Sequence, residues 1–201
     1  GTGSAIVVAV AGAGKTTTII EALKLIPQGE TVQLIAFNKD IATELQSRVP
    51  GHVRAQTFHS VGFGALRRRL QERVRINLIN HKTRELCKRE LTEEQCGLYS
   101  NYVCRLVSLA KGEGLGVLQP DHPATWTQLA THHDLYLESE DASEDEGQAL
   151  AQHVLKAGNA AAEREGMIDF DDQLYLPLLW KLRYVQADWV FIDEAQDTNP
   201  V

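Results

Sequence analysis

Two short segments near opposite ends of the chain hold residues whose types and spacing fit phosphate chemistry. The first is the glycine-rich stretch Ala9–Thr16, AVAGAGKT, and the second is the acidic stretch Asp193–Asp197, DEAQD. A glycine-rich loop can turn its backbone N–H groups toward phosphate oxygens, and the lysine near its end adds a positive charge. Carboxylates can bind Mg²⁺ and activate water. The two segments together predict a site for ATP with Mg²⁺.

The glycine-rich stretch differs at one position from the usual phosphate-binding pattern, which begins with glycine where this chain has Ala9. Lys15 is expected to act as a catalytic residue that reaches the β- and γ-phosphates, and the Thr16 hydroxyl is expected to bind Mg²⁺. The alternative, a glycine-rich turn with an incidental lysine, is disfavoured by the strand pattern before the loop and the helix pattern after it. The predicted nucleotide-binding residues are Ala11, Gly12, Ala13, Gly14, Lys15, Thr16 and Thr17.

The acidic stretch follows an apolar run, and ligands of open α/β sheets bind at the carboxyl ends of the strands. Asp193 is predicted to bind Mg²⁺ through its water shell, because Mg²⁺ gives up water reluctantly. Glu194 is predicted to orient or deprotonate the attacking water. Two adjacent acids after a strand are by themselves more typical of a helix N-terminus. The glycine-rich loop upstream in the same chain favours the catalytic interpretation.

Alternating strand and helix patterns surround both segments. Apolar or β-branched runs predict parallel strands at Ala5–Ala9, Val32–Phe37, His52–Gln56 and Trp189–Ile192. Helices are expected at Thr16–Ile26 and Asp40–Arg48, and each of them ends close to a proline. This order is typical of an α/β fold with a doubly wound parallel sheet.

The middle of the chain reads differently, because helical periodicity continues there with no convincing strand. Helices are predicted at Gly64–Arg75, Lys82–Lys88, Glu93–Lys111 and Gly147–Arg164, and a last one at Phe170–Leu182. The acidic stretch Glu138–Glu146 is interpreted as a solvated linker. The predicted organisation is an α/β domain formed by residues 1–64 and 166–201 and interrupted by a helical insertion at residues 65–165.

Composition places the chain among ordinary globular proteins, with 43% apolar and 23% charged residues. No apolar run approaches the roughly 20 residues of a membrane span, so no membrane association is expected. The three cysteines lack the Cys-x-x-Cys spacing of zinc or redox sites. They are predicted to be reduced thiols in a cytoplasmic protein. The cysteines are Cys87, Cys96 and Cys104.

Charge is distributed unevenly along the chain, although the net charge is −7. Residues 1–118 carry an excess of six positive charges and residues 119–201 an excess of thirteen negative ones. The basic excess could follow a phosphate backbone, or it could be a solvated helix face, and charge alone favours neither. It centres on Arg67, Arg68, Arg69, Arg73, Arg75, Lys82, Arg84, Lys88 and Arg89.

The acidic stretch also resembles motif II of UvrD/Rep-like superfamily 1 helicases, which move 3′ to 5′ on single strands. Three further segments agree in order: Ala36–Ala42 resembles motif Ia, Thr57–Ser60 resembles motif Ib, and Ile168–Asp172 resembles the acidic-aromatic segment before motif II. The helical insertion matches by position alone. The resemblance implies a RecA-like P-loop core in the ATP-binding part of a DNA helicase.

The resemblance also implies contacts with single-stranded DNA. Phe37 and Phe58 fit aromatic groups near bases, although Phe37 fits a core position equally well and Phe58 could pack beneath the DNA path. Gln196 would act as a catalytic residue that links the γ-phosphate to the DNA side. Asp169 is read locally as a helix cap rather than a ligand. The predicted DNA-binding residues are Phe37, Asn38, Lys39, Thr57, Phe58, His59 and Ser60.

A second RecA-like domain of the same polypeptide is the remaining partner that the resemblance implies. It would follow Val201 and supply an arginine finger, so the chain by itself is expected to hydrolyse ATP marginally and to unwind no duplex. Two alternatives stay open. The chain could be a stand-alone or degenerate P-loop nucleotide-binding module without helicase activity, or an unrelated P-loop kinase, which would leave the DEAQD stretch unexplained.

Overall fold

A computed structural model describes residues 3–8, 10, 13–198 and 200–201 of the chain. The chain divides into two compact units. Unit 1 consists of Gly1–Phe58 with Val185–Thr198, and unit 2 consists of His59–Tyr184 with Asn199–Val201. The mixed α/β class with a parallel sheet, which the sequence predicts, is confirmed.

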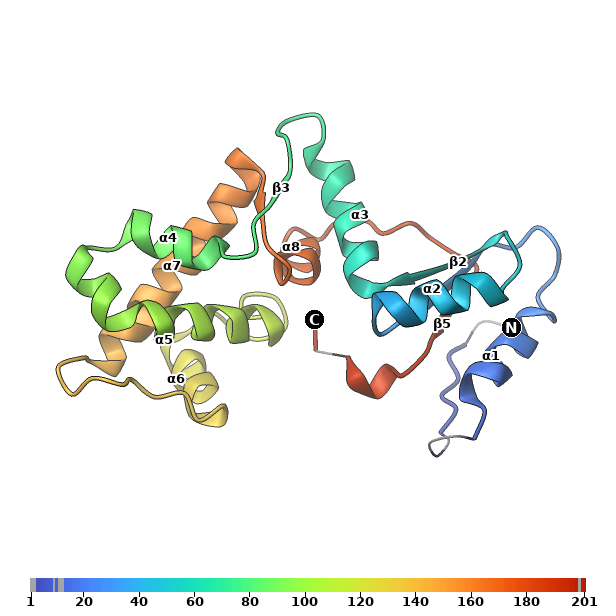
Figure 1. Cartoon of the computed structure of the whole chain (residues 1–201), viewed down its shortest axis with the longest axis horizontal. Helices are drawn as coiled ribbons and strands as arrows, with labels where there is room; N and C mark the ends of the chain where they lie inside the picture. The colour runs from blue at the N-terminus through green and yellow to red at the C-terminus, as the bar shows by residue number, and fades with distance from the viewer. Residues whose placement is uncertain (1–2, 9, 11–12, 199) are drawn as a thin grey trace. The chain divides into compact units, whose positions relative to one another are not determined.

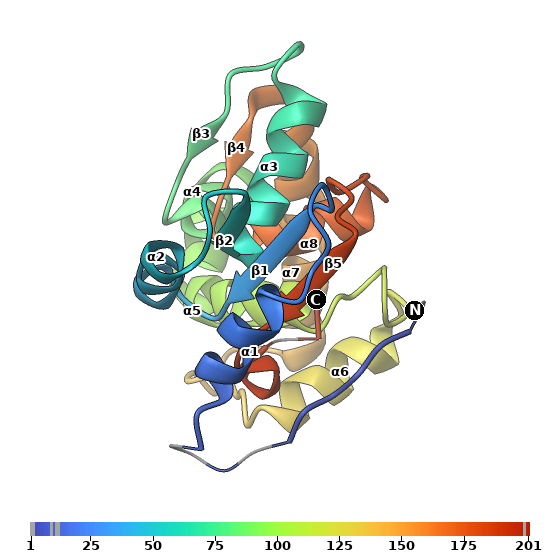
Figure 2. The same cartoon turned by 90° about the vertical axis from the view of Figure 1, so that its right-hand side faces the viewer.

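Unit 1 is built on a three-stranded parallel sheet in the order β2-β1-β5 (Figure 2). Strand β1 (Val32–Ala36) lies in the middle, between β2 (Val53–Thr57) and β5 (Trp189–Ile192). Each strand lies within about one residue of its predicted range. Helices α1 (Lys15–Leu23) and α2 (Lys39–Arg48) complete the unit.

The core of unit 1 explains why these elements hold together. Leu23 of α1, Leu34 of β1 and Leu45 of α2 are almost completely buried in one apolar cluster. Because the three strands are parallel, their carboxyl ends share one edge of the sheet. The residues that follow the strands, Phe37 after β1 and Asp193 after β5, therefore belong to the same edge, where α/β folds bind ligands.

The first predicted strand, Ala5–Ala9, is wrong for the residues that the structure describes. Residues 5–8 form no strand, and Ile6 and Val8 are 91% and 92% exposed. A strand exists only where its backbone groups pair with a neighbour, and this segment is not part of the β2-β1-β5 sheet. An apolar β-branched run was therefore insufficient to predict a strand here.

Unit 2 is mostly helical (Figure 1). Its long helices α5 and α7 pack against each other and against α4 and α6 around a buried cluster that includes Leu106, Trp126 and Val154. Its helices are α3 (Phe58–Leu70, which begins at the last residue of unit 1), α4 (Lys82–Glu90), α5 (Glu93–Gly112), α6 (Pro123–His132), α7 (Glu144–Glu165) and α8 (Asp172–Leu179).

Three features of unit 2 differ from the prediction. Helix α6 was missed, although His122 caps it and Pro123 occupies its first turn. Helix α7 begins inside the stretch that was predicted to be a linker, because Ser143 caps it and acidic residues favour a helix N-terminus. A short parallel pair, β3 (Asn77–Leu78) with β4 (Met167–Ile168), adds strands where none was expected.

Among the described residues, no helix is both long enough and apolar enough to cross a membrane.

Candidate nucleotide site and aromatic surface

The described end of the glycine-rich loop leads directly into helix α1. Gly14 caps the helix with a φ of 80°, a left-handed conformation that glycine adopts without steric cost. Lys15 and Thr16 are the first two residues of α1, where the helix dipole and unpaired N–H groups favour an anion. Ala13 and Thr17 are also described, but Ala9, Ala11 and Gly12 lie outside the described residues.

Strand β5 positions the acidic residues. The backbone N–H of Asp193 donates to the carbonyl of Ile35 at 2.9 Å, which extends the pairing with β1 by one residue. Glu194 then turns the chain with a φ of 52°, and a short 3-10 helix, Ala195–Asp197, follows it. A left-handed conformation costs a residue other than glycine about 1 kcal/mol, so the sheet and the turn together hold Glu194 in place.

Two contacts join the glycine-rich loop to the acidic stretch. The Thr16 hydroxyl donates to a carboxylate oxygen of Asp193 at 2.9 Å. The Lys15 ammonium lies 3.1 Å from a carboxylate oxygen of Glu194. The structure therefore brings together four residues that the sequence singled out, although the loop and the acidic stretch are 177 and 179 positions apart at these contacts.

The charged pair at this site is accessible to solvent. The side chains of Lys15 and Glu194 are 27% and 31% exposed. Hydrogen bonds from Gln196 and from Lys15 lower the pKa of the Glu194 carboxyl, so this group is a carboxylate at neutral pH. Gln196, the third predicted catalytic residue, thus contacts Glu194 directly. An exposed pair of this kind contributes little stability, so separating Lys15 from this carboxylate costs little.

The oxygen atoms of Thr16 and Asp193 fit a Mg²⁺ ion. Mg²⁺ takes oxygen ligands, and this pair offers a hydroxyl and a carboxylate within one hydrogen-bond length. Asp193 is buried, whereas the start of α1 is open. The donor set is therefore suited to an ion that keeps most of its water shell.

The predicted DNA-binding residues of unit 1 follow β1 and β2. Phe37 is 48% exposed, so the alternative of a core position is wrong. The side chain of Asn38 caps α2 by accepting a hydrogen bond from the N–H of Ile41 at 2.9 Å. Lys39 is exposed at the first position of α2, and Thr57 is buried at the end of β2. Phe58 is half-buried at the start of α3.

Unit 2 contains an aromatic pair in which the sequence singled out His59 as a site residue but not Phe170. The ring of His59 stacks on the ring of Phe170, with centroids 3.7 Å apart and planes 18° apart. Phe170 is 61% exposed, and Ser60 next to His59 is exposed as well. Burial lowers the pKa of His59, against the opposite effect of Asp171, so the imidazole is neutral at pH 7. The resemblance of Ile168–Asp172 to a helicase segment was the one available signal for Phe170.

A buried charge network of four residues, Lys82, Lys111, Asp169 and Asp172, fixes the turn that carries Phe170. Lys111 lies 2.6 Å from Asp169 and 2.8 Å from Asp172, and Lys82 lies 2.6 Å from Asp172. The backbone N–H groups of Asp169 and Asp172 each donate to the other residue's carboxylate, which is the reciprocal pair that the sequence predicts. The helix itself begins later than predicted, at Asp172, with Asp171 at its N-cap position. Lys82 is fully buried, and its assignment to the basic cluster available for phosphates is therefore wrong.

The turn has a further anchor. The Ser108 hydroxyl of α5 donates to the Asp171 carboxylate at 2.6 Å. Phe170 is thus an exposed residue between the buried ion pairs of Asp169 and Asp172, and the side chain of its partly buried neighbour Asp171 is anchored to α5.

Comparison with protein families matches residues 1–201 to the family described as UvrD/REP helicase N-terminal domain. The match spans the glycine-rich loop, both compact units and the acidic stretch after β5. The family implies ATP use and a helicase-type role. Because the match covers the whole sequence, this chain belongs to the UvrD/REP helicase N-terminal domain family.

Proposed function

We propose that the chain binds ATP with Mg²⁺ at the start of helix α1 and supplies the hydrolytic residues of a DNA helicase. One observation carries the proposal: Thr16 contacts Asp193 and Lys15 contacts Glu194, so a phosphate-binding loop meets a pair of carboxylates. The backbone around Ala13 and Gly14 and the first turn of α1 with Thr17 complete the phosphate site. Ala11 and Gly12 belong to the same proposal on sequence grounds.

Each contacting side chain has a distinct role in this proposal. Lys15 exchanges its carboxylate partner for the β- and γ-phosphates of the nucleotide. Thr16 and Asp193 hold Mg²⁺, which supplies charge neutralisation between the phosphates when it is bound. Glu194, released from Lys15 and kept ionised, orients and deprotonates the attacking water. Gln196 keeps the Glu194 carboxylate in place and transmits the state of the γ-phosphate.

Nucleotide binding is tested by the thermal stability of the chain. ATP or ADP with Mg²⁺ at 100 times the dissociation constant should stabilise the protein by about 2.7 kcal/mol. Lys15→Ala should remove this stabilisation. Lys24→Ala is the matched control, because Lys24 is an exposed lysine at the other end of α1 that pairs with Glu21. A nucleotide-induced shift that persists in Lys15→Ala contradicts the assignment.

Single-stranded DNA is the proposed nucleic-acid partner. The exposed Phe37 and the exposed Phe170 on His59 offer rings on which bases can stack, each worth about 1–3 kcal/mol. Asn38, Lys39, Thr57, Phe58 and Ser60 are also proposed to contact single-stranded DNA. The half-buried, neutral His59 supports a stacking role rather than a phosphate contact.

A fluorescence titration with a labelled oligonucleotide tests this part. Phe170→Ala should weaken binding by roughly 5- to 150-fold. Tyr136→Ala is the control, because Tyr136 in the same unit is also 61% exposed. Binding should weaken as salt rises. Equal affinities for the two variants, or binding insensitive to salt, argue for the alternative of a nucleotide-binding module without a DNA role.

We further propose that the helicase moves from 3′ to 5′ on single-stranded DNA. A second RecA-like domain is proposed to complete the ATP site. The domain would add an arginine to the charge stabilisation that Lys15 and Mg²⁺ provide. The 201-residue chain alone is therefore expected to hydrolyse ATP marginally. Robust turnover stimulated by single-stranded DNA, and lost in Glu194→Gln, would show that the second domain is unnecessary. Unwinding of duplexes with 3′ or 5′ tails by a protein that includes both domains tests the direction.

A further inference from the structure

The structure divides the basic residues at positions 67–89 into those with a carboxylate partner and those without. Lys82 belongs to the buried charge network. Arg69 pairs with Glu163 of α7 at 3.4 Å. Arg89 likewise pairs with Glu165 at 3.0 Å. In the described part of the chain, no carboxylate forms an ion pair with a second group of arginines, which we call the arginine cluster. It consists of Arg67, Arg68, Arg73, Arg75 and Arg183.

The end of helix α3 brings most of the arginine cluster together. Arg67 and Arg68 lie in the last turn of α3. The N–H of Arg73 donates to the carbonyl of Leu70 at 2.8 Å, in the turn that follows the helix. The guanidinium of Arg68 donates to the backbone carbonyl of Arg183 at 3.3 Å, so the segment that precedes unit 1 adjoins the same end of α3.

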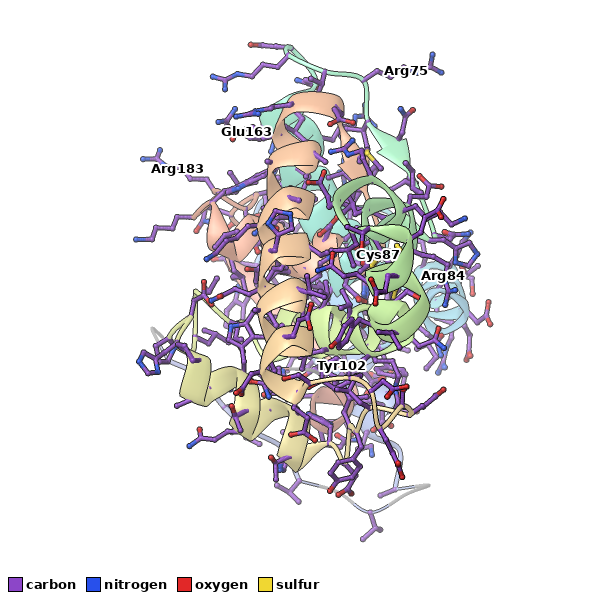
Figure 3. The ribbon with its side chains drawn as sticks, turned by 90° about the vertical axis from the view of Figure 1, so that its left-hand side faces the viewer. Arg75, Arg84, Cys87, Tyr102, Glu163 and Arg183 are labelled. Carbon is purple, nitrogen blue, oxygen red and sulfur yellow. The ribbon has the colours of Figure 1, made fainter. Side chains whose placement is uncertain are left out.

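The end of helix α7 fixes the backbone next to Arg75. The N–H of Asn77 donates at 2.8 Å to the carbonyl of Gly166, which is the C-cap of α7. Figure 3 shows the side chains of Arg75 and Arg183 extending outward at the end of unit 2 where Glu163 of α7 lies. Positive charges that gather at one place raise the local potential and favour a negatively charged partner.

Stabilisation of a helix C-terminus explains only part of this arrangement. The helix dipole favours cations in the last turn, where Arg67 and Arg68 lie. This effect falls off within one turn, so it does not account for Arg73, Arg75 or Arg183. All five side chains belong to exposed residues. The arginine cluster is therefore accessible to an anionic ligand.

The exposed face of α3 connects the arginine cluster to the aromatic pair. His59, which stacks on Phe170, lies near the start of α3 and is followed by the exposed Ser60. Ser60 and Arg67 are seven residues apart, so they lie on one face of the helix, about 10 Å apart along its axis. Three nucleotides stacked at 3.4 Å each span about the same length. A strand that stacks on Phe170 can therefore reach Arg67 along a single helix.

The acidic stretch Glu138–Glu146 does not cancel the charge of the arginine cluster. Helix α7 has 22 residues and is therefore about 33 Å long. Its first turn belongs to the acidic stretch, whereas its last residues adjoin the end of α3. Salt screens charges beyond about 8 Å at 0.15 M ionic strength. The net charge of −7 is thus compatible with a local positive surface at this end of unit 2.

We propose that the arginine cluster binds the phosphate backbone of DNA and extends the DNA site from Phe170 along α3. The inference rests on the proposed function, because it takes DNA as the ligand. Guanidinium groups form charge-assisted hydrogen bonds with phosphate oxygens. Such contacts position the DNA and are independent of its base sequence. A single strand and a duplex present the same phosphates, and the experiment distinguishes these two sources.

Titrations of the 201-residue chain at several salt concentrations test the proposal, with an unpaired oligonucleotide and a duplex of equal length as ligands. The double variant Arg67→Gln, Arg68→Gln should lose two phosphate contacts. The slope of log affinity against log salt concentration should become shallower by about 1.4 on the single strand or about 1.8 on the duplex. Because the two proteins should converge near 1 M salt, the affinity at 0.1 M should fall roughly 25- to 60-fold.

Two control variants separate a phosphate contact from other effects. The double variant Arg67→Lys, Arg68→Lys keeps both positive charges and should keep the salt dependence of the native chain. Lys88→Gln removes one charge outside the arginine cluster, because Lys88 is an exposed residue of α4. This variant should leave the slope unchanged. Circular dichroism confirms that each variant is folded.

The ligand that shows the shallower slope identifies the source of the phosphates. A change on the single strand shows that the stacked strand continues along α3, and a change on the duplex shows that paired DNA lies there. An unchanged slope on both ligands overturns the proposal. So does a slope that becomes equally shallow in Lys88→Gln.

Phe170→Ala, measured in the same titrations, separates this inference from the proposed function. If Phe170→Ala weakens binding and the glutamine double variant keeps the native slope, the stacking site stands and its extension along α3 is wrong. If Phe170→Ala has no effect and the double variant lowers the slope, the arginine cluster is a phosphate site and the stacking role is wrong.

Discussion

Each unit contains lysine–carboxylate pairs, and the two sets differ in burial rather than in chemistry. In unit 1, Lys15 and Glu194 lie 3.1 Å apart with both side chains about a quarter to a third exposed. In unit 2, Lys82 and Asp172 lie 2.6 Å apart with both side chains fully buried. Water can solvate either partner of the first pair when they separate. Neither partner of the second pair has that alternative.

The difference distinguishes a proposed ligand-binding site from a site that stabilises the fold. A carboxylate lies beside Lys15, and in the proposed function a phosphate replaces it. In unit 2, burial by itself would raise the pKa of Asp172, but the ammonium groups of Lys111 and Lys82 outweigh it and lower that pKa. The two acidic partners likewise raise the pKa of Lys111, against the effect of burial. In this network the lysines keep Asp172 ionised and the aspartates keep Lys111 protonated.

The largest expected effect comes from removal of one buried charge. Lys82→Met should lower the free energy of unfolding by about 3–5 kcal/mol, because it leaves Lys111 as the single cation beside the two buried carboxylates of Asp169 and Asp172. Urea denaturation followed by circular dichroism measures the loss. Lys15→Met, the matched change in the exposed pair, should cost no more than about 1 kcal/mol. Similar losses for both variants would remove the distinction between the two pairs.

A second, smaller effect probes the close packing of unit 2. A Cβ atom on Gly62 of α3 would lie 1.8 Å from the backbone oxygen of Gln173 in α8. Gly62→Ala should therefore lower the free energy of unfolding by about 1–3 kcal/mol. Gly97→Ala in α5 meets no atom within 4 Å and should stabilise the chain slightly, by about 0.5–1 kcal/mol. Thermal denaturation of both variants tests the contrast. A Gly62→Ala variant as stable as the native chain would show that α8 can shift away from α3 at little cost.

The smallest effect concerns pH. Burial lowers the pKa of His59 in the folded state below its unfolded value of 6.5. The unfolded chain therefore binds more protons in this window, so stability is lost as pH falls below about 6.5 toward the folded pKa. The melting temperature should drop by at most about 4 °C between pH 7.5 and 5.5 through this residue. His59→Phe, which keeps a ring on Phe170, should show a shallower pH dependence than the native chain.

The sequence predicted best those strands and helices whose local pattern of apolar residues matches their burial in the fold. β1, β2, β5, α1 and α2 were all predicted, because buried parallel strands are short apolar runs and the helices end near Pro27 and Pro50. The start of α7 was missed although Ser143 and Glu146 show the capping pattern in the sequence. The prediction failed because the acidic composition of Glu138–Glu146 was taken to indicate a linker. The position of Ser143 three residues before Glu146 indicates the start of a helix instead.

Other features depend on contacts that a single sequence does not encode locally. Lys82 was counted in the basic cluster, and only the approach of Asp169 and Asp172 from another part of the chain makes its burial and that of Lys111 possible. The residues of the nucleotide site were named from the glycine-rich and acidic patterns, whereas the contact between Lys15 and Glu194 required the sheet.

The position of β5 in the chain also sets an order of events during synthesis. Strand β1 pairs with β2 soon after both emerge from a ribosome, but its other neighbour follows only after the whole of His59–Tyr184 has been made. Asp193 and Glu194 therefore reach Lys15 and Thr16 last. Closing a flexible loop of that length would cost considerable chain entropy, and a unit 2 that folds early shortens the effective loop. The nascent protein thus has a period in which its helical unit can be complete while the proposed ATP site does not yet exist.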